Sequence, residues 1–418
     1  MSDQKRWYAG VDWGSQNHCV FLTDEAGRKI GERTFPHGGQ GLADMAAFLM
    51  EASGAPEPGC VHVAIETPHG PVVEALMERG FSVHAINPKQ MDRFRDRFTV
   101  AGAKDDSRDA EVMASSVRTD PRCFRRLEAT DPTVVELREF SRMADELGDE
   151  RIRLANRLRE QLWRYFPALL ELEDDMGAEW LLDLWKAAPT PQKAARLREA
   201  TIAAILKRRR IRRLDAAEVR AALRKPPLSL AAGTVEAACA HIATLIPRIR
   251  LVNRQIKDAE RRIDALIARL APPQESAEAE PGQTKQPDGA ILASVPGVGR
   301  TVVAKLLTEA PDPLRRRDYT ALRSLTGVAP VTRQSGKSRT VVRRQACNPR
   351  LADAVYHWAR VAVQHDPRSQ AKYAELRRRG HSHGRALRSV ADRLLNVACA
   401  MLKAGTLFDP EKARQNAA

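Results

Sequence analysis

The 418-residue sequence predicts three parts: an α/β domain, a long helical arm and a mostly α-helical C-terminal domain. Strand-like and helix-like runs alternate from residue 7 to about 118. Two later segments carry apolar residues at spacings of three and four, and residues 272–289 lack aromatic and large aliphatic side chains. We therefore expect domains at 1–125, 130–271 and 290–410, joined by a flexible linker at 272–289.

The first domain opens with three short strand-like runs. Turn signals lie around Ser15 and in the sequence DEAG, which predicts that these strands form an antiparallel meander. Two more strands and three helices are expected after them. The predicted strands cover 7–14, 18–27, 29–35, 61–68 and 81–88, and the predicted helices cover 42–52, 71–80 and 108–118.

The arm is predicted from two heptad-like segments that form an antiparallel coiled coil of helices about 50 Å long. The second segment carries its apolar residues at Val235, Ala238, Ile242, Leu245, Ile249, Val252, Ile256, Ala259, Ile263, Leu266 and Leu270. The first carries them at Leu137, Phe140, Ala144, Leu147, Leu154, Leu158, Leu162 and Tyr165, with Arg151 interrupting. Between them, residues 173–232 are predicted as a helical insertion, whose basic run LKRRRIRRL is either a solvated helix face or a nucleic-acid contact.

The formal net charge of +15 lies entirely in the last third of the chain. Residues 291–418 contain 24 Lys and Arg against 9 Asp and Glu, whereas the preceding residues contain 44 of each kind. A basic excess confined to one domain favours a nucleic-acid partner. The six cysteines form no CxxC pair, which argues against a zinc site. Because no long apolar run and no apolar N-terminal stretch occur, we expect a soluble, intracellular protein without a membrane partner.

Four carboxylates lie where an α/β fold can bring them together. Asp12 lies in the first strand, Glu66 ends a later one, and Asp106 and Asp109 share one face at the start of a helix. Hard cations such as Mg²⁺ prefer oxygen ligands, so the set predicts a Mg²⁺ site. Taken singly, each carboxylate could instead accept a turn hydrogen bond or cap a helix. Asp105 remains an alternative to Asp106, because a four-residue spacing also keeps two side chains on one face.

Two glycines predict a DNA-contacting turn in the C-terminal domain. The sequence ILASVPGVGRTVVAKLL places Gly297 and Gly299 between two apolar helical runs, as in a helix-hairpin-helix element. Glycines there would let the backbone approach a DNA phosphate closely. A helix C-cap followed by a new helix is the alternative.

Ser335 lies in a glycine-containing loop rich in cations. The cations nearest in sequence, which we expect to bind DNA, are Arg333, Lys337, Arg339, Arg343 and Arg344. A serine hydroxyl needs a base or a cationic setting before it can attack a phosphate. Ser335 is therefore either a nucleophile or a residue that only contacts phosphate. Ser338, beside Arg339, is the competing nucleophile.

The order of the carboxylates resembles the ribonuclease-H-like fold of RuvC-type nucleases, in which two metal ions assist phosphodiester transfer. The motifs GVDWG, IETPHG, DSRDAEVMA, VPGVGRTVVAKLL and LTGVAPVTRQSGKS together resemble the DEDD-type transposases of bacterial insertion sequences. That family is related to Piv-type DNA invertases and is described as bridge-RNA-guided recombinases. The likeness covers both ends of the chain in the same order.

This resemblance implies a site-specific DNA transposase or recombinase of an insertion sequence. It matches Asp12, Glu66, Asp106 and Asp109 to a metal-binding tetrad, and Ser335 to the serine nucleophile of a C-terminal transposase domain. It further implies a composite site from both domains, phosphoserine intermediates and a dimer or tetramer. Its partners would be double-stranded DNA of the element ends and target, and a noncoding bridge RNA bound by the RuvC-like domain and the arm. The expected location is the bacterial cytoplasm, at the nucleoid.

Two other classes stay open from the sequence. One is a metal-dependent, structure-selective endonuclease of the junction-resolvase kind, in which water attacks and Ser335 has no covalent role. The other is a non-catalytic nucleic-acid-binding protein with structural carboxylates. Loss of activity on replacing Asp12 separates the last class from the enzymes, and a covalent protein–DNA adduct separates the transposase from the endonuclease.

Overall fold

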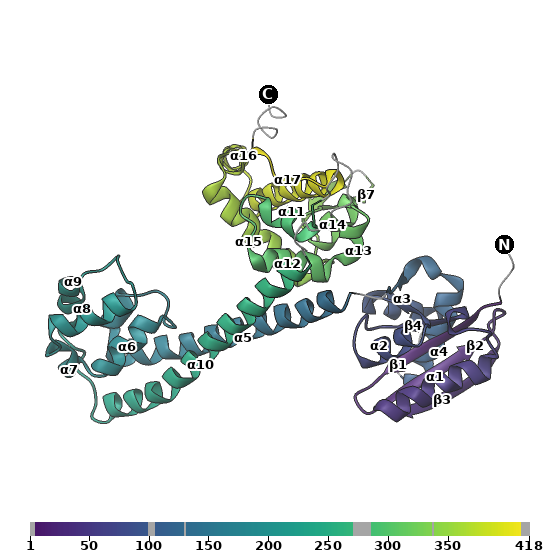
Figure 1. The fold of residues 1–418 in the computed structure, drawn as a ribbon, viewed down its shortest axis with the longest axis horizontal. Coiled ribbons are helices and arrows are strands. Elements are labelled where there is room, and N and C mark those ends of the chain that lie inside the picture. Colours follow the sequence, from purple (N-terminus) through teal and green to yellow (C-terminus); the bar gives the residue numbers. More distant parts are fainter. Residues whose placement is uncertain (1–4, 99–104, 129–130, 271–285, 337, 411–418) are drawn as a thin grey trace, which may run out of the picture. The chain divides into compact units, whose positions relative to one another are not determined.

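The computed structural model describes residues 5–98, 105–128, 131–270, 286–336 and 338–410. The chain divides into two compact units, Met1–Thr130 and Asp131–Ala418. Figure 1 shows a sheet flanked by helices in the first unit and mostly helices in the second. Within the described ranges, no helix is both long enough and apolar enough to cross a membrane.

The first unit contains a six-stranded mixed sheet in the order β3-β2-β1-β4-β5-β6. The strands are β1 (Trp7–Trp13), β2 (Asn17–Thr23), β3 (Lys29–Pro36), β4 (Val61–Ile65), β5 (Ser82–Ala85) and β6 (Arg125–Arg126). The first three are antiparallel, which confirms the predicted meander, and β4 and β5 run parallel to β1. This arrangement is consistent with a ribonuclease-H-like domain. The short strand β6, antiparallel to β5, was not predicted.

Helices cover both faces of this sheet. One face packs on α1 (Gly39–Ser53) and α2 (Pro71–Glu78), and the other packs on α3 (Pro88–Phe98) and α4 (Asp106–Thr119). Side chains alternate along a strand, so Trp7, Ala9 and Val11 of β1 enter the core beneath α1 and α2. The even-numbered residues of β1 consequently face α3 and α4.

Gly10 lets α4 rest directly on β1. A Cβ atom at Gly10 would lie 1.9 Å from the carbonyl oxygen of Ala110 and 2.8 Å from the backbone nitrogen of Ala114. Any other residue at position 10 would therefore push the helix away from the sheet. This contact holds the first turns of α4 close to the carboxyl end of β1.

The second unit is built on two long helices, α5 (Pro132–Tyr165) and α10 (Thr234–Arg269), which pack against each other (Figure 1). They run antiparallel, because Arg269 near the end of α10 bonds Glu136 near the start of α5. Most residues of both predicted apolar seams are buried, and the interruption at Arg151 has a structural reason: its guanidinium bonds Asn253 of α10 at 2.8 Å. The knobs-into-holes packing of a true coiled coil stays a prediction.

The predicted insertion folds into short helices over the end of this pair. These are α6 (Glu179–Ala187), α7 (Pro191–Ala195), α8 (Glu199–Arg208) and α9 (Ala216–Leu223), and the short helix η3 (Pro167–Glu171) lies just before the predicted range. Three arginines of the basic run LKRRRIRRL are used internally. Arg208 and Arg209 bond Asp183 at 2.9 and 2.7 Å, and Arg213 bonds Glu173 at 2.7 Å. Part of this run therefore holds the insertion together, and Lys207, Arg210 and Arg212 are exposed, so the choice between a solvated face and a nucleic-acid contact stays open.

The C-terminal part is mostly helical and contains one small hairpin. Its helices are α11 (Asp288–Ser294), α12 (Arg300–Glu309), α13 (Pro311–Arg315), α14 (Tyr319–Leu325), α15 (Pro349–His365), α16 (Pro367–Arg378) and α17 (His383–Ala404). The hairpin is formed by β7 (Val331–Ser335) and β8 (Ser338–Val342). Helix α11 starts at Asp288, inside the range predicted as linker, and residues 271–285 of that range lie outside the described residues.

Charged side chains join the arm to the C-terminal helices. Lys305 of α12 is only 4 % exposed, and its ammonium lies 3.2 Å from both Asp145 of α5 and Asp353 of α15. Arg350 bonds Asp145 at 2.8 Å and Glu309 at 3.0 Å. Breaking a buried charge pair leaves an uncompensated charge, so these contacts fix α12 and α15 on the arm.

Candidate functional site

Asp12 and Glu66 lie side by side at the ends of two parallel strands. The last residues paired between β1 and β4 are Val11 and Ile65, and each carboxylate belongs to the next residue. Asp12 is two residues after Gly10, so it shares the face of the sheet that α4 covers. Glu66 is two residues after Ala64 and therefore points to the same face of the sheet. Ala64 packs in the core beneath α3 and α4. Both carboxylates therefore belong to one face of the sheet.

The first turn of α4 brings two more carboxylates to this face. Asp105 is the N-cap residue, and Asp106 and Asp109 lie within the first turn, where the partial positive charge of the helix start favours acidic side chains. Asp109 is 3 % exposed and directly precedes Ala110, whose carbonyl contacts Gly10. The fold thus places the predicted tetrad at one end of one sheet face.

Cys19 of β2 shows how close these charges lie. It is paired directly with Asp12 across the β1–β2 ladder. Burial raises the pKa of its thiol above the ordinary value, and the negative charges of Glu32, Asp12 and Asp106 raise it further. Glu32 of β3 also accepts a hydrogen bond from the Ser107 hydroxyl of α4. Asp106 therefore lies close enough to the sheet to act on Cys19, and the choice between Asp105 and Asp106 as the third ligand stays a prediction.

Asp109 is held by an arginine from α3. The Arg95 Nε donates to Oδ1 of Asp109 at 2.6 Å, and its Nη2 donates to Oδ2 at 2.8 Å. This bidentate bond raises the pKa of Arg95 above its ordinary value, and the charges of Asp92 and Glu66 add to the increase. A cationic group therefore already binds one of the four predicted ligands and feels the charge of a second.

The donor set fits a hard divalent cation in its chemistry. Four carboxylates supply only oxygen ligands, which Mg²⁺ prefers. With the side chains as they stand, the described part of the chain holds no group of three or more His, Cys, Asp or Glu residues arranged to bind a metal ion. Both oxygens of Asp109 accept from Arg95 in this arrangement.

Ser335 lies at the tip of the β7–β8 hairpin. Its partner across the ladder is Ser338, and the turn between them contains Gly336 with φ of +53°. Directly opposed residues share a face, so the hydroxyls of both serines lie on the same side. The hairpin leaves both candidate nucleophiles exposed, and their roles stay a prediction.

The predicted cations divide between the two faces of this hairpin. Arg333 is paired with Thr340 and shares the face of Ser335, whereas Arg339 is paired with Gln334 and lies on the opposite face. Arg343 and Arg344 follow β8, and the Nε of Arg344 donates to the carbonyl of Ala329 at 3.2 Å. Lys337 lies outside the described residues.

The two glycines of the predicted helix-hairpin-helix element have different surroundings. Gly297 has φ of +81°, and a Cβ there would lie 2.7 Å from the backbone nitrogen of Ala362 in α15. Its missing side chain therefore serves the packing of α15. Gly299, the N-cap of α12, is exposed, and a Cβ there would meet no atom within 4 Å. A phosphate could approach only the second glycine in the way that the sequence predicted.

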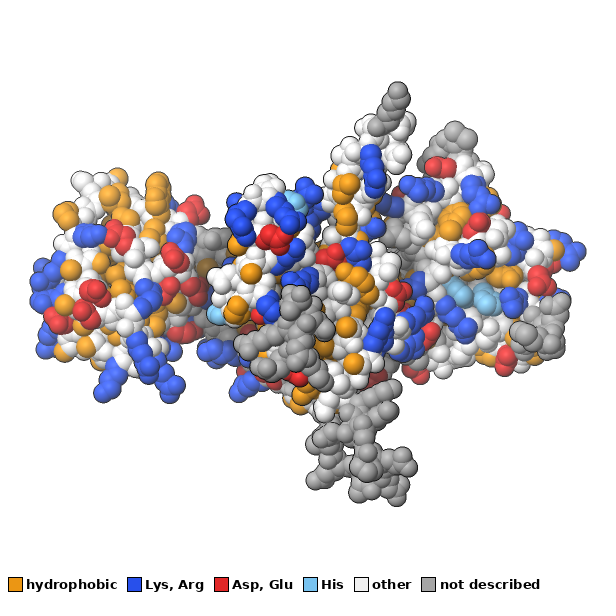
Figure 2. All heavy atoms as spheres, turned by 90° about the horizontal axis from the view of Figure 1, so that it is seen from above, with side chains coloured by type: hydrophobic (Ala, Val, Ile, Leu, Met, Phe, Trp, Pro, Cys, Tyr) orange, Lys and Arg blue, Asp and Glu red, His pale blue; other side chains and the backbone are white. Residues whose placement is uncertain are grey.

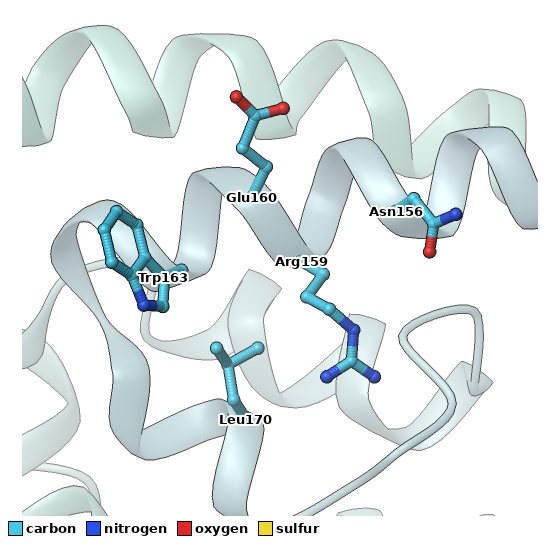
Figure 3. Close-up of a pocket in the computed structure, with 5 residues that line it drawn as sticks. All are labelled: Asn156, Arg159, Glu160, Trp163 and Leu170. Carbon is cyan, nitrogen blue, oxygen red and sulfur yellow. The ribbon is translucent and has the colours of Figure 1, made fainter.

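A groove of about 480 Å³ lies on the arm, apart from all of these residues. Figure 3 shows its lining, four side chains of α5 and one of η3: Asn156, Arg159, Glu160, Trp163 and Leu170. Trp163 is 69 % exposed. An exposed indole beside a guanidinium is a surface on which nucleic-acid bases stack.

Figure 2 shows Lys and Arg side chains in many separate groups over the visible face, with Asp, Glu and hydrophobic side chains between them. The presence of arginines therefore does not by itself distinguish a nucleic-acid surface in this chain. The informative arginines are those without a carboxylate partner.

The sequence did not single out Arg95, Glu32 or Cys19. Helix α3 was missed altogether, although Met91 and Phe94 are three residues apart in an otherwise polar run and both are buried. That spacing is a weak helical signal. Nothing in it indicates that Arg95 would meet Asp109.

Two family models match the chain. One for DEDD transposases of the IS110 type, described as "Transposase", matches residues 9–167. The other, described as "Transposase IS116/IS110/IS902 family", matches residues 289–374. The first match spans β1, β4 and α4, and the second spans the hairpin that carries Ser335.

Several curated proteins are similar to this chain. A "Putative transposase y4uE" of Sinorhizobium fredii is 74% identical over 216 residues, which cover 52% of this chain and 60% of that protein. The "Mini-circle putative transposase for IS117" of Streptomyces coelicolor is 32% identical over 97% of this chain and 96% of its own length. An "Insertion element IS110 uncharacterized 43.6 kDa protein" of the same species is 27% identical over 96% of this chain and 95% of its own length.

Proposed function

Since the chain belongs to the IS116/IS110/IS902 family of transposases, we propose that it cuts and rejoins DNA strands at the ends of an insertion sequence. The single observation that carries the proposal is the placement of Asp12, Glu66, Asp106 and Asp109 at one end of one sheet face. Carboxylates on one face of a sheet can supply the oxygen ligands that a divalent cation prefers, which supports a site for metal-assisted phosphodiester chemistry.

The tetrad would hold Mg²⁺, with Asp12 and Glu66 contributed by strand ends and Asp106 and Asp109 by α4. The ion would supply charge stabilisation to the oxygens of the phosphodiester during attack and departure. The chain's own contribution is orientation: Gly10 keeps α4 on the sheet, and the bidentate bond from Arg95 fixes the position of the buried Asp109 carboxylate.

Ser335 is the proposed nucleophile. Its hydroxyl oxygen would form the new phosphorus–oxygen bond as the bond to the leaving DNA oxygen breaks, and its proton would pass to a base while the leaving oxygen takes one up. Arg333 on the same face of the hairpin supports this role, because its charge can stabilise the phosphate as negative charge develops. Ser338 shares that face and is the alternative.

We further propose that the arm contacts a noncoding bridge RNA and that the active species is a homo-oligomer. The support for RNA is the exposed Trp163 beside Arg159, together with the exposed Arg153 and Arg157 of α5, which make no ion pair among the described residues. Aromatic and guanidinium groups together can stack bases and bind phosphates.

A trapping experiment tests the proposed function. Full-length protein is mixed with DNA carrying the element's ends and Mg²⁺, denatured, and examined for a covalent protein–DNA adduct. Wild type and Ser338→Ala should form the adduct, and Ser335→Ala should not. Asp12→Ala should form neither adduct nor cleaved product while it keeps its cooperative unfolding. Cleavage without an adduct would favour the water-dependent endonuclease, and cleavage by Asp12→Ala would remove the role of the tetrad.

A further inference from the structure

Three arginines at the start of α17 and the end of the hairpin lie close enough for the charges of Arg343 and Arg385 to act on Arg388. Arg385 and Arg388 lie in the first two turns of α17, and Arg343 directly follows β8. We call these residues the arginine cluster. The guanidinium of Arg388 folds back over the helix start, since its Nη1 lies 3.4 Å from the position of a Cβ on Gly384.

The arginine cluster concentrates positive charge that the described residues do not neutralise. Burial lowers the pKa of Arg388 below its ordinary value, and the nearby charges of Arg343 and Arg385 lower it further. None of the three forms an ion pair within the described part of the chain. A partly buried arginine close to like charges is costly unless an anion joins it.

The carboxylate best placed to neutralise Arg388 is used elsewhere. Asp392 follows one turn later on α17, at a spacing that brings side chains together. Its two oxygens accept from Arg323 at 2.9 and 2.5 Å, and Oδ1 also accepts from the Tyr319 hydroxyl at 2.8 Å. Asp392 is thus fixed to α14 and leaves Arg388 without a counter-ion.

The N-terminus of α17 adds to the positive electrostatic potential of the arginine cluster. Ser382 caps α17 without a side-chain hydrogen bond, and no acidic residue lies in the first turn. The amide groups of that turn carry partial positive charge and attract anions. Arginines in the first turns of a helix are unfavourable unless an anion joins them, so the two observations point to the same ligand.

We propose that the arginine cluster binds a backbone phosphate of the DNA strand on which Ser335 acts. Arg343 follows Val342, which pairs with Val331, and Ser335 lies four residues further along β7. At about 3.3 Å per residue, the base of the hairpin is roughly 13 Å from Ser335. The cluster would therefore hold a phosphate about two nucleotides from the one attacked. The choice of DNA as ligand rests on the proposed function.

Salt-dependent binding tests the cluster without any chemistry. Full-length protein is titrated with a short fluorescein-labelled DNA duplex in EDTA at several salt concentrations, and anisotropy gives the binding constant. Each lost phosphate contact should reduce the slope of log K against log salt by about 0.9. Arg388→Gln and Arg385→Gln should each show that reduction, and Arg388→Lys should not. Arg393→Gln, an exposed arginine further along the same helix, is the matched control and should keep the wild-type slope.

Thermal unfolding without DNA completes the test. Relief of repulsion should leave the melting temperature of Arg388→Gln equal to or above that of wild type, whereas a structural arginine would lower it. If Arg388→Gln does not fold, the slope is measured on Arg385→Gln, because Arg385 is exposed and its replacement should not affect folding. Wild-type slopes in both variants would overturn the proposal, as would a slope change seen with single-stranded RNA and absent with DNA. If the arginine variants show the reduced slope on DNA but the wild-type protein forms no covalent adduct, the arginine cluster is supported and only the serine mechanism is rejected.

Discussion

Arg95 and Asp109 form a bidentate ion pair on the face of the sheet where the predicted metal ligands lie. Both carboxylate oxygens of Asp109 are bonded, at 2.6 and 2.8 Å, and Asp109 is only 3 % exposed. The guanidinium is thus the counter-ion of this buried carboxylate. The proposal that Asp109 is a metal ligand therefore implies that a metal ion and Arg95 compete for it.

Replacing Arg95 should strengthen divalent-ion binding and weaken the ion-free protein. Arg95→Gln leaves a buried carboxylate unpaired, which costs about 3–5 kcal/mol of stability without metal. Added Mn²⁺ should then raise the melting temperature more than in wild type, and Mn²⁺ titration by electron paramagnetic resonance should show tighter binding. Arg97→Gln is the control, because Arg97 lies on the same helix and pairs at 2.8 Å with the more exposed Asp120. Equal Mn²⁺ affinity in the two variants would contradict the competition.

Arg333 and Arg339 should differ in catalysis more than in binding. Arg333 shares the hairpin face of Ser335, and Arg339 lies on the other face. Arg333→Gln should slow adduct formation by about 10²-fold, because one cationic group near the developing charge is lost. Arg339→Gln should weaken DNA binding to a similar extent as Arg333→Gln and leave the rate at saturating DNA almost unchanged. Rapid quenching at saturating DNA measures both rates, and equal losses would remove the distinction between the faces.

Gly297 and Gly299 should respond oppositely to alanine. Gly297→Ala places a Cβ against α15 at positive φ and should destabilise the C-terminal helices by about 2–4 kcal/mol. Gly299→Ala meets open space and should cost less than about 1 kcal/mol while it weakens DNA binding. Denaturant unfolding and anisotropy measure the two effects. Unchanged DNA binding in a folded Gly299→Ala protein would show that this turn does not contact the backbone.

Mixing two inactive variants tests whether the carboxylates and the serine can be supplied by different protomers. Asp12→Ala lacks a proposed ligand and Ser335→Ala lacks the proposed nucleophile. Restored strand exchange in the mixture, and in neither variant alone, is expected if the active species is an oligomer in which subunits share the reaction. The readout is the rejoined DNA product, and size-exclusion chromatography with light scattering checks that mixed oligomers form. A mixture as inactive as its parts would mean that each protomer works with its own residues.

The histidine pair of the sheet should make stability depend on pH. The Nδ1 of His62 and the Nε2 of His84 are 3.0 Å apart, and burial lowers the pKa of His84 from 6.5 to about 4, helped by the charges of His62 and Arg126. The unfolded chain therefore takes up a proton that the folded chain resists, so this stability is present above pH 6.5 and is lost as pH falls toward 4. Urea unfolding at several pH values should show the loss. His84→Gln should flatten that dependence, and an unchanged profile would assign it to other groups.

The sequence by itself determined the features that repeat locally. Apolar spacing along a helix records which face is buried, so most residues of the two long seams of α5 and α10 were predicted correctly. The meander and the carboxylates at strand ends were likewise readable, because strand alternation and turn signals span only a few residues. The family resemblance supplied the roles of these residues.

Only the tertiary structure decided which charges meet. Arg95 binds Asp109, Arg208 and Arg209 bind Asp183, and Arg388 is left beside other arginines. Each outcome depends on contacts between segments distant in the chain, and a long cationic side chain carries no periodic signal of its partner. The sequence therefore shows where positive charge is abundant, whereas the fold decides which part of it is neutralised and which part is left to bind an anion.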